Sequence, residues 1–270
     1  MRSPRPGRYR PLFAVLVLAA AAAVSAGGEG RPPATSAPPS ADELSARHCT
    51  AVGGVAAIER HRSMYVKGVV TVPGKGLQGE IEQYTAAPDR FQTRYSVPGL
   101  AEFTNGHDGR VAWRVDGGGR ARVIDGRERK DLLLSADFYA ELNYKTSYSV
   151  RETVGHAKHA GKDCYQVRLV TDYGEEVMQY FDVESGLLVG RESWYGKPGE
   201  AVKQTQSVLG YQKIGGRLVA TEFREAFGDS EERVKLEVVR FDDVDDKVFE
   251  LPEPVRRVLA QRDPRPAAPK

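Results

Sequence analysis

Few residues of this 270-residue chain have the types and spacing that catalysis or metal binding requires. His156 and His159 are three positions apart, and on a helix that spacing could place two imidazoles against one metal ion. Gly155 and Gly161 flank them, however, and no third ligand lies close in the sequence. A hairpin loop is therefore the better interpretation, and we expect no metal site there.

Four aspartates, at positions 242, 243, 245 and 246, form an acidic cluster of the kind that can bind calcium. An EF-hand loop needs a glycine at its sixth position, and no register of this segment has one. A hydrated turn is favoured instead. The chain also lacks the Gly-x-Ser-x-Gly, His-Glu-x-x-His and Gly-x-x-x-x-Gly-Lys motifs. The sequence therefore predicts no catalytic residues, no metal and no cofactor.

Two cysteines, Cys49 and Cys164, are 115 positions apart. In an oxidising compartment they could form a disulfide, and closing so long a loop would contribute about 4–5 kcal/mol in the chain-entropy model. The alternative is two thiols that pack as small apolar groups. The sequence spacing does not distinguish the disulfide from the two free thiols. It also supplies no nearby base that would make Cys164 a nucleophile.

Residues 1–26 have the composition of a secretory signal peptide. Four arginines precede an apolar run from Leu12 to Ala26, which ends in the small-x-small pattern Val-Ser-Ala. As a helix this run would span about 22 Å, which is less than the ~30 Å hydrocarbon core of a membrane. We therefore expect cleavage rather than an uncleaved anchor, and no integral membrane span afterwards. The expected location is the periplasm, with secretion as the alternative.

The remaining chain is predicted to contain one folded domain, at 42–259. Residues 27–41 are rich in proline, glycine, alanine and serine and predict a disordered linker, and 260–270 predict a disordered tail. Residues 27–252 hold thirty basic and thirty-five acidic side chains. A body of that charge has no general attraction to phosphate backbones, which argues against nucleic-acid binding. We expect a monomer.

The elements that would hold any site begin with a helix from Asp42, its predicted N-cap, to about Ser63. The pair Gly53-Gly54 within it indicates a kink or close packing, because each glycine costs a helix about 1 kcal/mol relative to alanine. A second helix is predicted over 127–142, laid on the sheet as a lid. Its apolar stripe includes Leu132, Leu133 and Phe138.

From Met64 onward the apolar period is two, and turn signals recur every 8–12 residues. A long sheet must curl, because each strand twists by roughly 20–25° relative to its neighbour. The predicted fold is mainly β: a single strongly curved antiparallel sheet, an unclosed half-barrel of about 11–13 strands, with an N-terminal helix and a helical lid. Such a sheet can enclose an apolar cavity. The residues expected to line this cavity are Val70, Ile81, Trp113, Val167, Leu169 and Phe181. Shifting a strand by one residue would move its side chains to the other face, so this assignment depends on the register.

Six features have a familiar pattern: 51–58 (AVGGVAAI), Ser63 before a strand that contains Gly68, 108–113 (DGRVAW), 136–138 (ADF), 180–188 (YFDVESGLL) and 242–252 (DDVDDKVFELP). Together they resemble exported bacterial proteins related to the outer-membrane lipoprotein carriers, the LolA/LolB-like family. The resemblance implies an unclosed β-barrel with a helical lid that holds acyl chains. It brings no catalytic motif.

These observations favour an exported, non-enzymatic binding or carrier protein for a lipid, acyl chain or lipoprotein. Its expected partners are an amphiphilic or acylated ligand and, as a further possibility, proteins of the cell envelope. One alternative is a structural or interaction module of the envelope with a filled core. A hydrolytic enzyme is the third hypothesis, and it would require Cys164, a histidine and an acid to converge in one cleft.

Overall fold

The computed structural model describes residues 37–196 and 201–262. The predicted signal peptide and residues 27–36 of the predicted linker lie outside the described residues. Within the described part, the α-helices are α1 (Ala41–Ala51), α2 (Val55–Glu59), α3 (Gly126–Ala136), α4 (Tyr144–Ser147) and α5 (Glu253–Arg262). Two 3₁₀ turns accompany them, η1 (Pro73–Lys75) and η2 (Asp246–Phe249).

The described strands form one sheet. They are β1 (Ser63–Val72), β2 (Leu77–Ala86), β3 (Arg90–Val97), β4 (Ala101–His107), β5 (Ala112–Asp116), β6 (Ala121–Ile124), β7 (Val150–His159), β8 (Lys162–Val170), β9 (Glu176–Asp182), β10 (Leu188–Tyr195), β11 (Val202–Ile214), β12 (Arg217–Phe227) and β13 (Ser230–Phe241). Their order is β6-β5-β4-β3-β2-β1-β13-β12-β11-β10-β9-β8-β7. Every pair is antiparallel, and β6 and β7 form two separate edges. The predicted mainly β, unclosed antiparallel sheet is confirmed.

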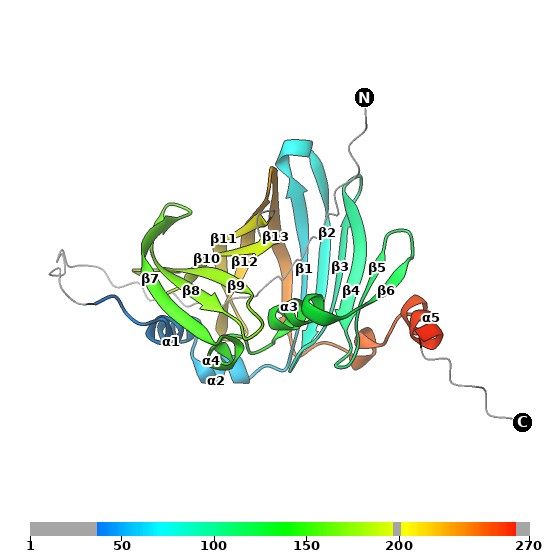
Figure 1. Cartoon of the computed structure of the whole chain (residues 1–270), viewed down its shortest axis with the longest axis horizontal. Helices are drawn as coiled ribbons and strands as arrows, with labels where there is room; N and C mark the ends of the chain where they lie inside the picture. The colour runs from blue at the N-terminus through cyan, green and yellow to red at the C-terminus, as the bar shows by residue number, and fades with distance from the viewer. Residues whose placement is uncertain (1–36, 197–200, 263–270) are drawn as a thin grey trace, which may run out of the picture.

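The sheet consists of two meanders, β1–β6 and β7–β13, which form the two wings visible in Figure 1. They join where β13 pairs with β1. The register shifts there between Lys67 and Gly68, which is the signature of a bulge. A Cβ at Gly68 would lie 2.4 Å from the backbone oxygen of Lys235, so only glycine fits this close approach.

The core lies on one face of the sheet, which we call the inner face. Its main apolar cluster is drawn from strands β1–β4 and β8–β13 and from helices α1 and α4. On β1, for example, Val66, Val70 and Val72 are buried, because alternate side chains of a strand point to the same face. Helix α3 lies across this sheet between the two wings (Figure 1).

The N-terminal helix differs from the prediction of one continuous helix. It breaks at Gly53, which has a φ of +116° that residues other than glycine rarely adopt. A Cβ added at Gly53 would lie 3.4 Å from the backbone oxygen of Gly216, so the chain also approaches its neighbour closely here. The N-cap is Ser40 rather than Asp42, since the Ser40 side chain accepts a hydrogen bond from the Glu43 N–H in a capping box.

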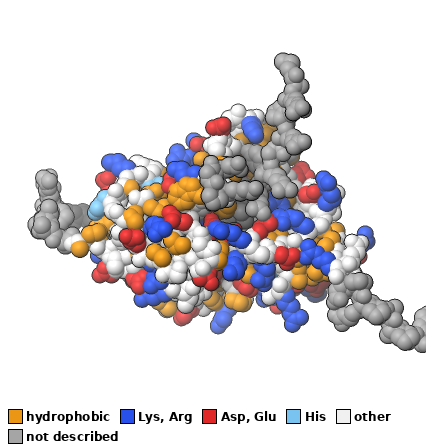
Figure 2. All heavy atoms as spheres, viewed as in Figure 1, with side chains coloured by type: hydrophobic (Ala, Val, Ile, Leu, Met, Phe, Trp, Pro, Cys, Tyr) orange, Lys and Arg blue, Asp and Glu red, His pale blue; other side chains and the backbone are white. Residues whose placement is uncertain are grey.

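The C-terminal part of the described chain also differs. Helix α5 was not predicted, and it extends to Arg262, three residues into the predicted disordered tail. It packs against β5 and β6 at one end of the sheet (Figure 1). None of the helices in residues 37–196 and 201–262 has the length and apolar character to cross a membrane. Basic and acidic side chains are interspersed over the face shown in Figure 2.

Candidate functional site

The inner face gathers most of the predicted cavity residues. Val70, Ile81, Val167, Leu169 and Phe181 are all buried members of its main apolar cluster. They come from four strands in both wings of the sheet, so the two meanders contribute to one apolar surface. Whether these five side chains contact a ligand stays a prediction.

Trp113 is on the other face, and its assignment to the cavity is wrong. Its neighbour Ala112 packs with Phe91 and Ile124 under Leu132, which places Ala112 on the inner face. Side chains alternate along a strand, so Trp113 points away from that face. Its ring covers Gly106 on β4, where an added Cβ would lie 2.7 Å from the indole. The predicted alternation of side chains along β5 is therefore shifted by one residue from the alternation in the structure.

The predicted lid helix is shorter than expected and ends at Ala136. Asp137 stops it, because its Oδ1 accepts hydrogen bonds from the Tyr139 N–H and the Asn143 Nδ2 and holds a turn. The chain then continues over the sheet to α4. We call residues 126–147, from α3 through α4, the crossing segment.

The crossing segment covers the inner face with two sets of apolar side chains. Leu132 and Ala136 belong to a small separate cluster over β3, β5 and β6. Leu134 and Phe138 pack against the main cluster, whereas Leu133 is only half-buried and belongs to neither. Of the predicted lid residues, Leu132 and Phe138 therefore pack toward the sheet, as does Leu134, which was not predicted; their role as a lid stays a prediction.

A buried ion pair fixes the middle of the crossing segment. Arg217 Nη2 lies 2.7 Å from Glu141 Oε1, and the two side chains are only 4% and 6% exposed. Burial raises the pKa of Glu141, and the attraction of Arg217 opposes that shift. The Tyr139 hydroxyl also donates to the His61 carbonyl at 3.0 Å, and the Phe138 N–H donates to the Pro88 carbonyl at 2.9 Å.

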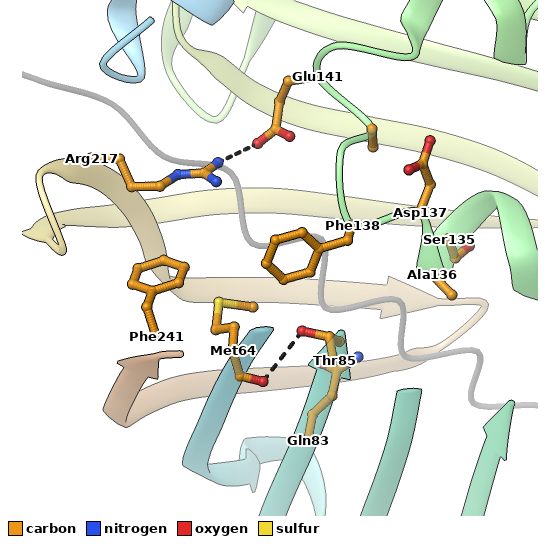
Figure 3. Close-up of a pocket in the computed structure, with 11 residues that line it drawn as sticks. Met64, Gln83, Thr85, Ser135, Ala136, Asp137, Phe138, Glu141, Arg217 and Phe241 are labelled. Carbon is orange, nitrogen blue, oxygen red and sulfur yellow. Dashed lines mark hydrogen bonds and ion pairs between the residues drawn. The ribbon is translucent and has the colours of Figure 1, made fainter. Parts of the chain in front are cut away.

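Two pockets lie on either side of this ion pair, and Ala140 and Glu141 line both of them. The Arg217 pocket holds about 480 Å³ of non-atom space, part of it open to solvent, between Met64, Phe138 and Phe241 (Figure 3). The Arg191 pocket holds about 500 Å³ on the same basis. A water-sized sphere can occupy only about 40 Å³ of each pocket, which is well below the roughly 300–1,000 Å³ of small-molecule sites.

The Arg191 pocket has an apolar and a polar side. Leu134, Phe181 and Leu188 continue into the main apolar cluster. Arg191 on β10 reaches the same face, because it pairs in register with Gln179, which pairs in turn with the buried Val167. His48 of α1 and Tyr144 of α4 complete the polar side.

The two cysteines are free thiols in the structure, so the disulfide considered from the sequence is not formed. The reason is packing: Cys49 lies against the cluster of Val52 and Ile58, and Cys164 lies in another cluster with Tyr180 and Val189. Burial raises the pKa of both thiols. Cys164 is fully buried, which gives a nucleophile no access to substrate.

The remaining chemistry candidates have structural partners. His159 is buried, stacks on Tyr180 and lies 3.0 Å from the Ser207 hydroxyl through its Nε2. Asp242 accepts hydrogen bonds from the backbone N–H groups of Arg62 and Ser63. Among the residues that the structure describes, no three metal-ligating side chains form a group.

Comparison with known proteins gives a fold. No family model matches the sequence, and no curated protein matches it. A DUF1329 family protein from Desulfovibrio piger ATCC 29098 is similar in structure, with 15% identity, a TM-score of 0.56, and coverage of 78% of this chain and 95% of that one. A LolA superfamily protein from Nitrosomonas europaea has 11% identity and a TM-score of 0.53, over 79% and 99% of the two chains. The chain has a LolA-like fold.

A third similar structure is a putative outer membrane lipoprotein-sorting protein domain from Vibrio parahaemolyticus, with 13% identity and a TM-score of 0.50 over 81% of this chain and 96% of that one. The resemblance that the short sequence stretches indicated is thus confirmed at the level of the LolA-like fold. At these identities the likeness describes the fold, and the side chains of the site must be judged on their own chemistry.

Within the LolA-like fold, sequence reasoning missed the polar residues of the site. They are His48, Glu141, Tyr144, Arg191 and Arg217. One signal was available in the sequence. Gln179 is two residues before Phe181 on β9, and alternate side chains of a strand point to the same face, so Gln179 lies on the inner face with Phe181. Arg191 follows only from the β9–β10 register, which short-range patterns do not contain.

Proposed function

We propose that this protein is an exported, non-enzymatic carrier that holds the acyl chain of a lipid, lipoprotein or other amphiphile against its inner face. The observation that supports this function most directly is the apolar cluster shared by both wings of the sheet, with two pockets opening beside it under the crossing segment. Burial of apolar surface would drive binding, at about 25 cal/mol per Å². The lipoprotein-sorting description of one structural neighbour is in keeping with this proposal.

The pockets also suggest how the ligand would enter. Leu134, Phe138 and Ala140 of the crossing segment lie between solvent and the cluster, so displacing this segment would uncover apolar surface. Location in the periplasm and amphiphile binding as a monomer belong to the same proposal. Envelope proteins would then be the donors or acceptors of the ligand.

The test is uptake of a fluorescent fatty acid by the delipidated protein, followed by titration and displacement with unlabelled amphiphiles. We expect saturable binding, and we expect Ala140→Trp to weaken it at least several-fold, since Ala140 lines both pockets. The matched control is Val154→Trp, which adds the same ring at a β7 position that is exposed to solvent. Melting curves of both variants check that the fold is retained.

Lack of saturable uptake across fatty acids, lysolipids and lipopeptides would contradict the carrier function. That result would favour the alternative of an interaction module with a filled core. Equal effects of Ala140→Trp and Val154→Trp would show that binding occurs elsewhere than in the two pockets.

A further inference from the structure

Three residues that line the Arg191 pocket each have a buried polar atom without a hydrogen-bond partner. These atoms are Nε2 of His48, the hydroxyl of Tyr144 and Nε of Arg191. His48 and Tyr144 are only 4% and 6% exposed, so water does not readily replace a missing partner. A buried polar group left unpaired is costly, and natural proteins seldom leave several together without a reason.

The hydrogen bonding of His48 shows which role its free nitrogen plays. The Leu188 N–H donates to His48 Nδ1 at 3.2 Å, so Nδ1 is an acceptor and the proton of the neutral ring is on Nε2. Burial lowers the pKa of His48 to about 3, against a smaller opposing effect of the Gly186 carbonyl, which keeps the ring neutral. The unpartnered Nε2 is therefore a hydrogen-bond donor.

Arg191 brings a second donor and a positive charge. It is half-buried on the inner face and forms no ion pair with another residue of the described chain. The Tyr144 hydroxyl is kept protonated, because burial raises its pKa. An N–H, an O–H and a guanidinium N–H thus belong to one pocket, and such a set complements an acceptor rather than another donor.

The acidic residue of the pocket does not cancel this preference. Glu141 is the one carboxylate among the lining residues, and its charge is paired with Arg217 at 2.7 Å. Leu134 and Phe181 form apolar walls that continue into the main cluster. A ligand whose oxyanion lay at Arg191 would have its hydrocarbon part directed along that cluster.

We infer that the Arg191 pocket binds the oxyanion head, a carboxylate or a phosphate, of a single-chain amphiphile through His48, Tyr144 and Arg191. This inference rests on the carrier function proposed above and adds the chemical class and the orientation of its ligand. The head lies between α1, α4 and β10, and the chain extends over Phe181 toward the centre of the sheet.

The experiment measures binding of palmitate, hexadecanol and inorganic phosphate to the delipidated full-length protein and to two variants. Arg191→Met should weaken palmitate binding by about ten- to a hundred-fold, the range for a lost charge-assisted hydrogen bond, and change hexadecanol binding by less than about two-fold. Tyr144→Phe removes only a hydroxyl and should weaken palmitate binding several-fold. The control Arg94→Met removes an exposed charge on the opposite face of β3 and should change neither ligand.

The three ligands and the variants distinguish failure of the carrier function from failure of the head-group inference. Binding of neither palmitate nor hexadecanol would overturn the carrier function, and with it this inference. Equal affinity for both amphiphiles, unaffected by Arg191→Met and Tyr144→Phe, would overturn the inference alone. Tight binding of inorganic phosphate that Arg191→Met abolishes, without preference for palmitate over hexadecanol, would assign the pocket to a free anion and overturn the head-group role.

Discussion

The buried pair of Arg217 and Glu141 allows the sharpest test of how the crossing segment is held. Arg217→Met keeps most of the side-chain volume but leaves the Glu141 carboxylate buried without its partner at 2.7 Å. Removing one member of a buried ion pair costs about 3–5 kcal/mol, because the remaining charge has no compensation. For a domain of this size, about 2–4 °C of melting temperature corresponds to 1 kcal/mol, so the expected drop is roughly 6–20 °C.

The assay is urea unfolding of the purified chain, repeated for the double variant Glu141→Leu with Arg217→Met. Replacing both charges by apolar groups removes the uncompensated charge, so the double variant should recover most of the lost free energy of unfolding. The control is Arg168→Met on the exposed pair Arg168–Glu176, which has the same 2.7 Å separation but side chains 36% and 43% exposed. Solvent screening should limit that loss to less than about 1 kcal/mol.

Two results would refute the reasoning. If Arg217→Met costs no more than Arg168→Met, the buried pair does not hold the segment. If the double variant loses at least as much free energy of unfolding as Arg217→Met alone, the effect comes from packing volume rather than from the unpaired carboxylate.

Three further predictions concern single positions. Burial raises the pKa of Glu225 to about 7, so the folded chain keeps a proton that the unfolded chain releases near pH 4.5. The free energy of unfolding should therefore fall as the pH rises from about 5 to 7. Glu225→Gln should flatten that fall in urea titrations at several pH values. Gly68→Ala should cost about 1–3 kcal/mol in urea unfolding, because its Cβ would meet backbone at 2.4 Å, whereas Gly74→Ala has open space and should cost much less. Because Cys49 and Cys164 are free, reductant should leave the melting temperature unchanged, and a thiol reagent should label the fully buried Cys164 only after unfolding is induced.

The fold could be predicted because its signals are local. Period-two apolar patterns and closely spaced turns identify strands that pair with their sequence neighbours, and in this sheet only the β1–β13 pairing joins strands that are far apart in the described chain. Five of six predicted cavity residues reach the inner face for the same reason. Trp113 is the exception, since the short strand β5 contains too few apolar positions to fix which face its residues occupy.

The polar part of the site could not be predicted because it depends on contacts between distant segments. Glu141 and Arg217 are 76 positions apart, and each lies in a stretch with no motif. The helix end at Ala136 was also missed, because the apolar stripe continues past it and the stop is made by the Asp137 side chain. In both cases a polar side chain overrides the apolar periodicity on which the sequence argument relies.

Under the proposed carrier function, the uneven attachment of the crossing segment indicates which part of it would move when ligand enters. Residues 137–143 are held by the Glu141–Arg217 pair and by hydrogen bonds of Phe138 and Tyr139 to backbone carbonyls. Helix α3 is attached through the apolar contacts of Leu132 and its neighbours and through the ion pairs of Glu128 and Arg127 at its first turn. The arginines of these pairs are 45% and 58% exposed, which screens their attraction to the less exposed carboxylates, and apolar contacts can be replaced by those of an acyl chain, so the lower cost of opening would lie in α3. Under the proposed carrier function, access to the inner face would depend on α3 lifting about a hinge at Asp137, while the ion pair keeps residues 137–143 in place.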